Sequence, residues 1–250
     1  MSTRTLFGLA AFAAVLAPGE LATAQPREAI MFPIIAAQPT PGAYGSLWVT
    51  TLAVHNEGEQ SKSILPICQI ACPPPLVVAP GQTREIQSLL LPGSYLLVDS
   101  GYPLNFHLRA RDLSRTSRSA GVEIPVVRED DFKPAVQLLN VPFEEDFRLS
   151  LRVYAARRQI DPQPQLFAQI RAFDDDGALI EELRLEIIFR GGGRPLGELH
   201  NLRSHMPQAR TYESVRFEVS IEPDPEGPIH TWALITVTNN DTQEVTVISP

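Results

Sequence analysis

Short runs of alternating apolar and polar residues recur along the chain. In the clearest run, residues 215–221, valine, phenylalanine and isoleucine alternate with arginine, glutamate and serine. Residues 183–189 and 106–111 repeat the pattern. A period of two places the apolar side chains on one face of a strand and the polar ones on the other. These runs therefore predict strands with one buried face, as in antiparallel β-sandwiches.

Helical periodicity is nearly absent outside a short stretch at residues 199–206. The chain also lacks alternating strand and helix patterns, which argues against a parallel nucleotide-binding sheet. Its 23 prolines and 15 glycines are scattered between the apolar runs, where they indicate turns. The fold class predicted from these features is all-β.

The sequence contains an internal repeat, because residues 48–56 align with residues 147–155. Leu52 and Val54 then fall in the same parity as Leu151 and Val153, and parity decides which face is buried. Each half ends in a pair of runs typical of a hairpin: 105–111 with 120–127, and 232–238 with 242–248. We therefore expect two tandem immunoglobulin-like antiparallel β-sandwich domains, 25–130 and 131–250, joined near the charged segment Arg128–Pro134.

The first 24 residues have the order of a secretory signal peptide. A weakly basic start is followed by the apolar run Leu6–Ala17, the breaker Pro18-Gly19 and the small-residue pattern Ala22-Thr23-Ala24. The expected cut lies after Ala24. The apolar run is too short to span a bilayer, which takes about 20 residues. We expect a secreted or periplasmic protein with no membrane insertion after cleavage.

The net charge limits the classes of partner, and the cysteine content bears on a disulfide and on metal binding. The formal net charge is −8, which disfavours nucleic acid and anionic membrane surfaces. Cys68 and Cys72 are the only cysteines, and in an exported chain they predict a local disulfide, with free thiols as the alternative. A metal site would need further ligands at matching spacing, and none is near in sequence.

The stretch Gly45-Ser-Leu-Trp48-Val-Thr50-Thr-Leu52-Ala-Val54-His-Asn56 resembles the opening strand of uncharacterised exported bacterial proteins with tandem immunoglobulin-like sandwich domains. Residues 80–83, 96–100 and 108–111 follow in a similar order. The resemblance covers the first half well and the second half loosely. It implies the fold and export, and it implies no activity, because its motifs concern packing and turns.

A positive group of side chains stands out in this acidic chain: His107, Arg109, Arg111, Arg115 and Arg118. By parity, the first three share the exposed face of one strand. Arginine forks suit carboxylate or sulfate groups, so an acidic glycan or the acidic edge of a partner protein is a candidate ligand. The alternative is a solvated face balanced by Glu123 and nearby acids, which discourages sheet pairing at an edge.

Two further features each allow a functional and a structural interpretation. Asp174–Gly177 is either a calcium site or, as the favoured interpretation, a hairpin with a two-residue turn. Trp48 and Trp232 are either exposed platforms for a sugar ring or, as favoured by their place in alternating strands, core residues.

Catalytic motifs are absent from the sequence. There is no Gly-x-Ser-x-Gly, no His-Glu-x-x-His and no cysteine in a nucleophile-like context. We expect no enzyme, no metal and no cofactor. The predicted function is a non-catalytic secreted structural or protein-interaction module with an unknown protein or glycan partner. The alternative is a carbohydrate-binding module for an acidic or cell-surface glycan.

Overall fold

The computed structural model describes residues 27–33, 36, 38–67, 74–86, 94–99, 104–114, 121–156, 165–188, 196–223 and 227–250. The proposed signal peptide, residues 1–24, lies outside the described residues. So do Cys68 and Cys72 of the predicted disulfide.

The described N-terminal half consists of short antiparallel strands. They are β1 (Arg27–Phe32), β2 (Thr40–Pro41), β3 (Leu47–Asn56), β4 (Lys62–Ile67), β5 (Leu76–Val78), β6 (Thr83–Ile86), β7 (Ser94–Asp99), β8 (Leu104–Asp112) and β9 (Val122–Ile124). One sheet has the order β1-β7-β4-β5 and another the order β2-β3-β8-β9, with β6 also paired to β3.

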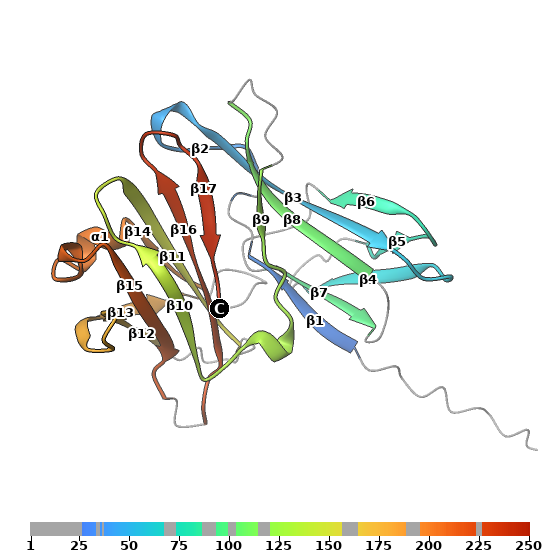
Figure 1. The fold of residues 1–250 in the computed structure, drawn as a ribbon. Helices are drawn as coiled ribbons and strands as arrows, with labels where there is room; N and C mark the ends of the chain where they lie inside the picture. The colour runs from blue at the N-terminus through green and yellow to red at the C-terminus, as the bar shows by residue number, and fades with distance from the viewer. Residues whose placement is uncertain are drawn as a thin grey trace, which may run out of the picture.

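The described C-terminal half is also built from antiparallel strands. They are β10 (Ala135–Pro142), β11 (Phe147–Ala155), β12 (Leu166–Phe173), β13 (Leu179–Ile187), β14 (Leu196–His200), β15 (Ser214–Ile221), β16 (Thr231–Asn239) and β17 (Val245–Ile248). They form sheets of order β10-β15-β12-β13 and β14-β11-β16-β17. The two halves lie beside each other, with β9 in contact with β17 (Figure 1).

Helix is confined to short pieces of the described chain: η1 (Ala43–Gly45), η2 (Glu129–Asp131), α1 (Leu202–His205) and η3 (Ala209–Thr211). The prediction of an all-β, sandwich-like fold is therefore confirmed. Among the described residues, none of the helices has the length and apolar character needed to cross a membrane.

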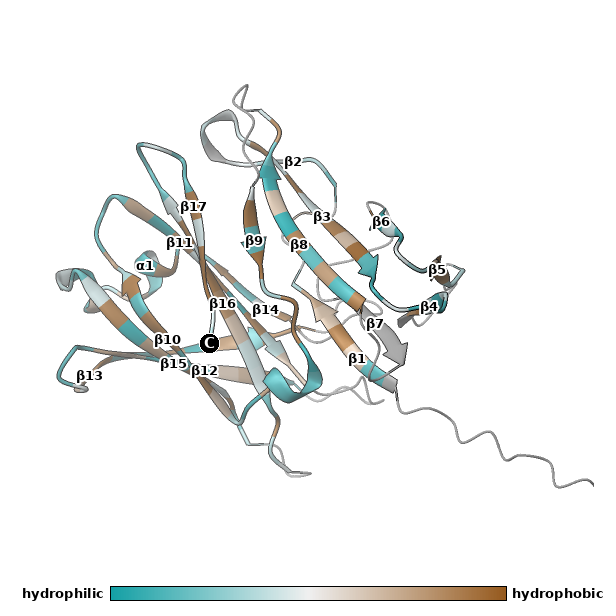
Figure 2. Ribbon diagram, turned by 45° about the vertical axis from the view of Figure 1, so that its right-hand side comes forward, coloured by the Kyte–Doolittle hydropathy of each residue, from teal (hydrophilic) through white to brown (hydrophobic). Residues whose placement is uncertain are grey.

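The predicted alternation is visible in the burial of individual strands. In β15, Val215, Phe217, Val219 and Ile221 are buried while the residues between them are partly exposed. In β8, Leu108 and Ala110 are buried and Arg109 between them faces outward. Apolar and polar bands therefore alternate along β8 (Figure 2).

The two predicted hairpins also form. β8 pairs with β9, and β16 pairs with β17. The Asn239 side chain closes the second turn, since its Oδ1 accepts hydrogen bonds from the backbone N–H groups of Asp241 at 2.9 Å and Thr242 at 2.8 Å. Asparagine side chains favour turns because they can replace a backbone acceptor in this way.

Two hydrophobic cores lie on opposite faces of one sheet, β14-β11-β16-β17. On one face, Leu151, Val153 and Ile235 join the core of the C-terminal half. On the other face, Tyr154, Leu196, Trp232 and Leu234 are buried in the core of the N-terminal half. Parts of β11 and β16 are therefore buried on both faces, and the contact between the halves is largely apolar.

Candidate functional site

Strand β8 presents the predicted residues His107, Arg109 and Arg111 on one outward face. Their side chains are 55%, 44% and 41% exposed, respectively. They share this face because β8 buries the alternate residues Leu108 and Ala110. The structure therefore places these three predicted residues on one face of β8. Arg115 and Arg118 lie outside the described residues.

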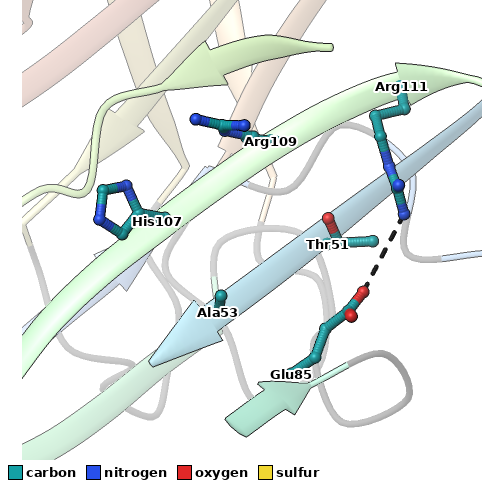
Figure 3. A pocket seen from close by; sticks show the side chains of 6 residues that line it. All are labelled: Thr51, Ala53, Glu85, His107, Arg109 and Arg111. Carbon is teal, nitrogen blue, oxygen red and sulfur yellow. Dashed lines mark ion pairs between the residues drawn. The ribbon is translucent and has the colours of Figure 1, made fainter. Parts of the chain in front are cut away.

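Beside these residues the surface is hollowed over β3, which lies between β8 and β6. The hollow is about 450 Å³ and is lined by six residues (Figure 3). We call it the arginine groove, and its lining residues are Thr51, Ala53, Glu85, His107, Arg109 and Arg111. Its volume is within the range of about 300–1,000 Å³ that is common for ligand sites.

The groove exists because small and large side chains face each other across the sheet. In the register of β3 and β8, Thr51 lies opposite Arg109, and Ala53 lies opposite His107. On the other side of β3, Ala53 lies opposite Glu85 of β6. Short side chains on the central strand, flanked by long ones on both neighbours, leave a depression along β3.

The charged groups of the groove are held by loose ion pairs. His107 Nδ1 lies 3.6 Å from Glu123 Oε1, and Arg109 Nη2 lies 4.0 Å from Glu123 Oε2. Arg111 Nη2 extends across β3 to within 4.0 Å of Glu85 Oε1 (Figure 3). These distances exceed the 2.7–3.2 Å of an ordinary hydrogen bond, and exposed pairs of this kind contribute little stability.

The Arg111 guanidinium has an incomplete set of partners. Its Nε is buried and has no hydrogen-bond acceptor among the residues that the structure describes, which is uncommon for a buried donor. An acceptor that drew the guanidinium slightly outward would satisfy this donor together with Nη2. The arrangement therefore favours a bidentate oxygen ligand such as a carboxylate.

Polar groups at one end of the same face are already paired. His55 Nδ1 and Thr83 Oγ1 lie 2.8 Å apart, and Asn105 Nδ2 donates to Glu57 Oε1 at 2.5 Å. The donors with loose partners are therefore concentrated near Arg109 and Arg111. Chemically, the groove can hold an anionic group by charge and hydrogen bonding.

Sequence reasoning missed Thr51, Ala53 and Glu85 as groove residues. For Thr51 and Ala53 a signal was present, because they alternate with the apolar Leu52 and Val54 and must face outward. For Glu85 the sequence carries no comparable signal, since its place depends on β6 pairing with β3.

The predicted turn at Asp174–Gly177 forms, but it is longer than the predicted two residues. Residues 174–178 connect β12 and β13, and the register shifts at Ala172 and Phe173. The Asp174 carboxylate accepts a hydrogen bond from the Ala178 N–H at 2.8 Å, and Gly177 has a φ of 84°. The side chain of Asp174 thus stabilises a wider loop. Within the described chain no group of three or more His, Cys, Asp and Glu residues is placed to hold a metal ion.

Both tryptophans pack inward, as the favoured interpretation expected. Trp232 is 4% exposed, and its ring centroid lies 5.9 Å from that of Tyr154. Trp48 is partly buried against the core of the N-terminal half, and its Nε1 donates to Ser46 Oγ at 3.0 Å. Neither indole lines the arginine groove.

In comparisons with known proteins, no protein-family model, no curated protein and no solved structure matches this chain.

Proposed function

We propose that this chain is an exported, non-catalytic interaction module that binds a partner protein through the arginine groove. The observation that carries the proposal is the gathering of His107, Arg109 and Arg111 around a hollow on a chain of net charge −8. A positive patch on an acidic protein attracts acidic partners and repels basic ones, which favours specific association.

Export and a tandem immunoglobulin-like arrangement are part of the same proposal. Removal of residues 1–24 as a signal peptide would start the mature chain at Gln25. The strand registers support a repeat, because β3 pairs with β8 in the first half and β11 pairs with β16 in the second. Leu52 then lies opposite Leu108, just as Leu151 lies opposite Ile235.

A carbohydrate-binding module for an acidic or cell-surface glycan is the second candidate. The arginines of the groove favour it, since they suit sugar carboxylates or sulfates. The packing of Trp48 and Trp232 against the hydrophobic core weighs against it, because sugar rings usually stack on exposed aromatic faces. Protein partners are therefore the better-supported class.

The test compares retention of the purified chain on the surface and secreted proteins of the cells that produce it. We expect the Arg109→Ala/Arg111→Ala double variant to lose about tenfold or more in retention. Arg210→Ala is the control for loss of an exposed arginine elsewhere on the surface, because Arg210 lies on η3 and outside the groove. Circular dichroism would confirm that each variant is folded.

Equal retention of the wild type and the double variant would refute the groove as the contact surface. Retention that survives protease treatment of the bound material but not removal of its glycans would favour the carbohydrate-binding alternative.

A further inference from the structure

We infer that the arginine groove receives the carboxylate of an aspartate or glutamate side chain from an acidic segment of a partner protein. This inference rests on the proposed function and specifies what is recognised. The carboxylate would lie above Thr51, between the guanidinium groups of Arg109 and Arg111.

The Arg111 guanidinium is placed to bind a carboxylate. It extends over β3, where Nε has no acceptor in the described part of the chain and Nη2 lies 4.0 Å from Glu85. A planar carboxylate accepts two parallel N–H bonds from such a fork. Binding would therefore satisfy a donor that the free protein leaves unpaired.

Thr51 and Ala53 provide a hydrogen-bond donor and space on the floor of the groove. The Thr51 hydroxyl is on the floor of the groove and makes no hydrogen bond with the described residues, so it is a free donor. Ala53 is the smallest lining side chain and keeps space open between His107 and Glu85, its two cross-strand neighbours. Space, a neutral donor and a cationic fork thus occur together.

The charges around the groove limit the kind of anion. Glu85 and Glu123 each lie within about 4 Å of an arginine in the groove. A doubly charged phosphate would be repelled by both of these carboxylates. A singly charged carboxylate would be repelled less, and it could replace one of them as the partner of an arginine. No Phe, Tyr or Trp is among the described residues that line the groove, so it lacks the large aromatic faces on which sugar rings usually stack. An acidic peptide is the ligand that these features favour.

A fluorescently labelled hexaglutamate peptide is the probe, and its binding would be followed by fluorescence anisotropy at low salt. We expect the Kd to increase about tenfold or more in Arg111→Gln, since a charge-assisted bond is lost. Thr51→Val keeps the side-chain shape and should increase the Kd about threefold to tenfold. Ala53→Leu leaves every charge in place and should weaken binding about tenfold or more by filling the groove.

Hexaglutamine and Arg210→Ala are the matched controls for ligand charge and for protein charge. We expect no binding of hexaglutamine and an unchanged Kd for Arg210→Ala. Unchanged hexaglutamate binding by Ala53→Leu and Thr51→Val would overturn the inference, because the peptide would then bind by charge alone. Binding of oligogalacturonate in place of hexaglutamate would also overturn it.

The outcome can be separated from that of the proposed function. If the arginine double variant loses its natural partner while hexaglutamate fails to bind, the groove is still a contact surface but the acidic side chain is not its ligand. If both experiments fail, the proposed function fails as well.

Discussion

Two buried polar side chains differ in whether their polar atoms are hydrogen-bonded. Asn56 at the end of β3 is fully buried, and all its polar atoms are used. Its Nδ2 donates to the carbonyls of Gln60 at 2.8 Å and Val78 at 2.9 Å, and its Oδ1 accepts from Gly58 N at 2.9 Å. Tyr154 is equally buried, but its hydroxyl has no hydrogen-bond partner among the described residues. The side-chain hydrogen bonds of Asn56 are expected to stabilise the fold, whereas the unpaired hydroxyl of Tyr154 is expected to weaken it.

Replacing Asn56 should be strongly destabilising. Asn56→Ala leaves the buried Val78 carbonyl without its donor and opens the turn that links β3 to β4. We expect a loss of about 2–4 kcal/mol in the free energy of unfolding, measured by urea titration. Asn105→Ala is the control, since Asn105 is exposed and its side chain bonds only to Glu57 among the described residues. A loss for Asn56→Ala no larger than for this control would contradict the prediction.

Replacing Tyr154 by phenylalanine should stabilise the protein at neutral pH. The change removes a hydroxyl that is desolvated without a hydrogen bond, so we expect a gain of about 1 kcal/mol in the free energy of unfolding. Tyr154→Leu, which also loses aromatic packing against Trp232, should destabilise instead. A marked loss of stability in Tyr154→Phe would show that the hydroxyl has a partner.

The same substitution should change the response to alkali. Burial raises the pKa of the Tyr154 hydroxyl above its ordinary value, against the lowering effect of Arg152. Because the folded-state pKa is raised, the unfolded chain loses its proton first, near pH 10, and stability falls as the pH rises further. Tyr154→Phe removes this contribution. Its advantage over the wild type should therefore grow above about pH 10, as measured by urea unfolding at pH 8 and pH 11.

At the scale of elements, the outer face of β12, β13 and β15 is held by pairs of charged side chains. Arg184 of β13 donates from Nε and Nη2 to Glu222, just beyond β15, at 2.6 and 2.7 Å. Its guanidinium carbon lies 3.4 Å from the centroid of the Phe167 ring on β12. On the same face, Arg171 pairs with Glu218. These contacts link strands that are distant in sequence.

The Arg184–Glu222 pair predicts a stability difference that depends on pH. The hydrogen bond from Arg184 lowers the pKa of Glu222 below its ordinary value. A lowered folded-state pKa gives stability that is present above the unfolded value, about 4.3, and is lost as the pH falls through the folded value. Glu222→Gln should therefore lower the urea midpoint at pH 7 and have little effect near pH 2.

Glu182→Gln is the control for this prediction, because Glu182 is exposed on the same face of β13. High salt should reduce the effect of Glu222→Gln at pH 7, since exposed ion pairs are screened. An equal effect of Glu222→Gln at both pH values would mean that its packing, and not its charge, stabilises the sheet.

Strands and hairpins were predictable to the extent that they depend on local periodicity. The outward face of β8 and the buried face of β15 follow from alternation alone. Alternation also places His107, Arg109 and Arg111 on the same face of β8. The pairing of β6 with β3, which brings Glu85 to Arg111, depends on contacts across about 30 residues of chain. The length of the Asp174 turn was wrong because a side-chain hydrogen bond stabilised the longer loop.

At the scale of the whole molecule, the two halves share a sheet. The sequence pattern predicted one buried face for each strand, but parts of β11 and β16 are buried on both faces. The cause is the covering of Tyr154, Trp232 and Leu234 by the N-terminal half. Tyr44 of η1 extends the contact, since its ring lies 4.8 Å from the guanidinium carbon of Arg148 on β11. Because the contact is largely apolar, we expect the halves to be coupled in stability.

This coupling predicts a single unfolding transition for the wild type. Far-UV circular dichroism and tryptophan fluorescence should give the same midpoint, as in two-state unfolding. Leu234→Ala removes buried side-chain volume from the contact between the halves and should cost about 2–5 kcal/mol. With the contact weakened, the halves should unfold at different denaturant concentrations, and the two probes should then give different midpoints.

Val219→Ala is the control, because Val219 is buried only in the core of the C-terminal half. Val219→Ala should lower stability by a smaller amount, and the midpoints from circular dichroism and fluorescence should still coincide. Two resolved transitions in the wild type would show that the shared sheet does not couple the halves.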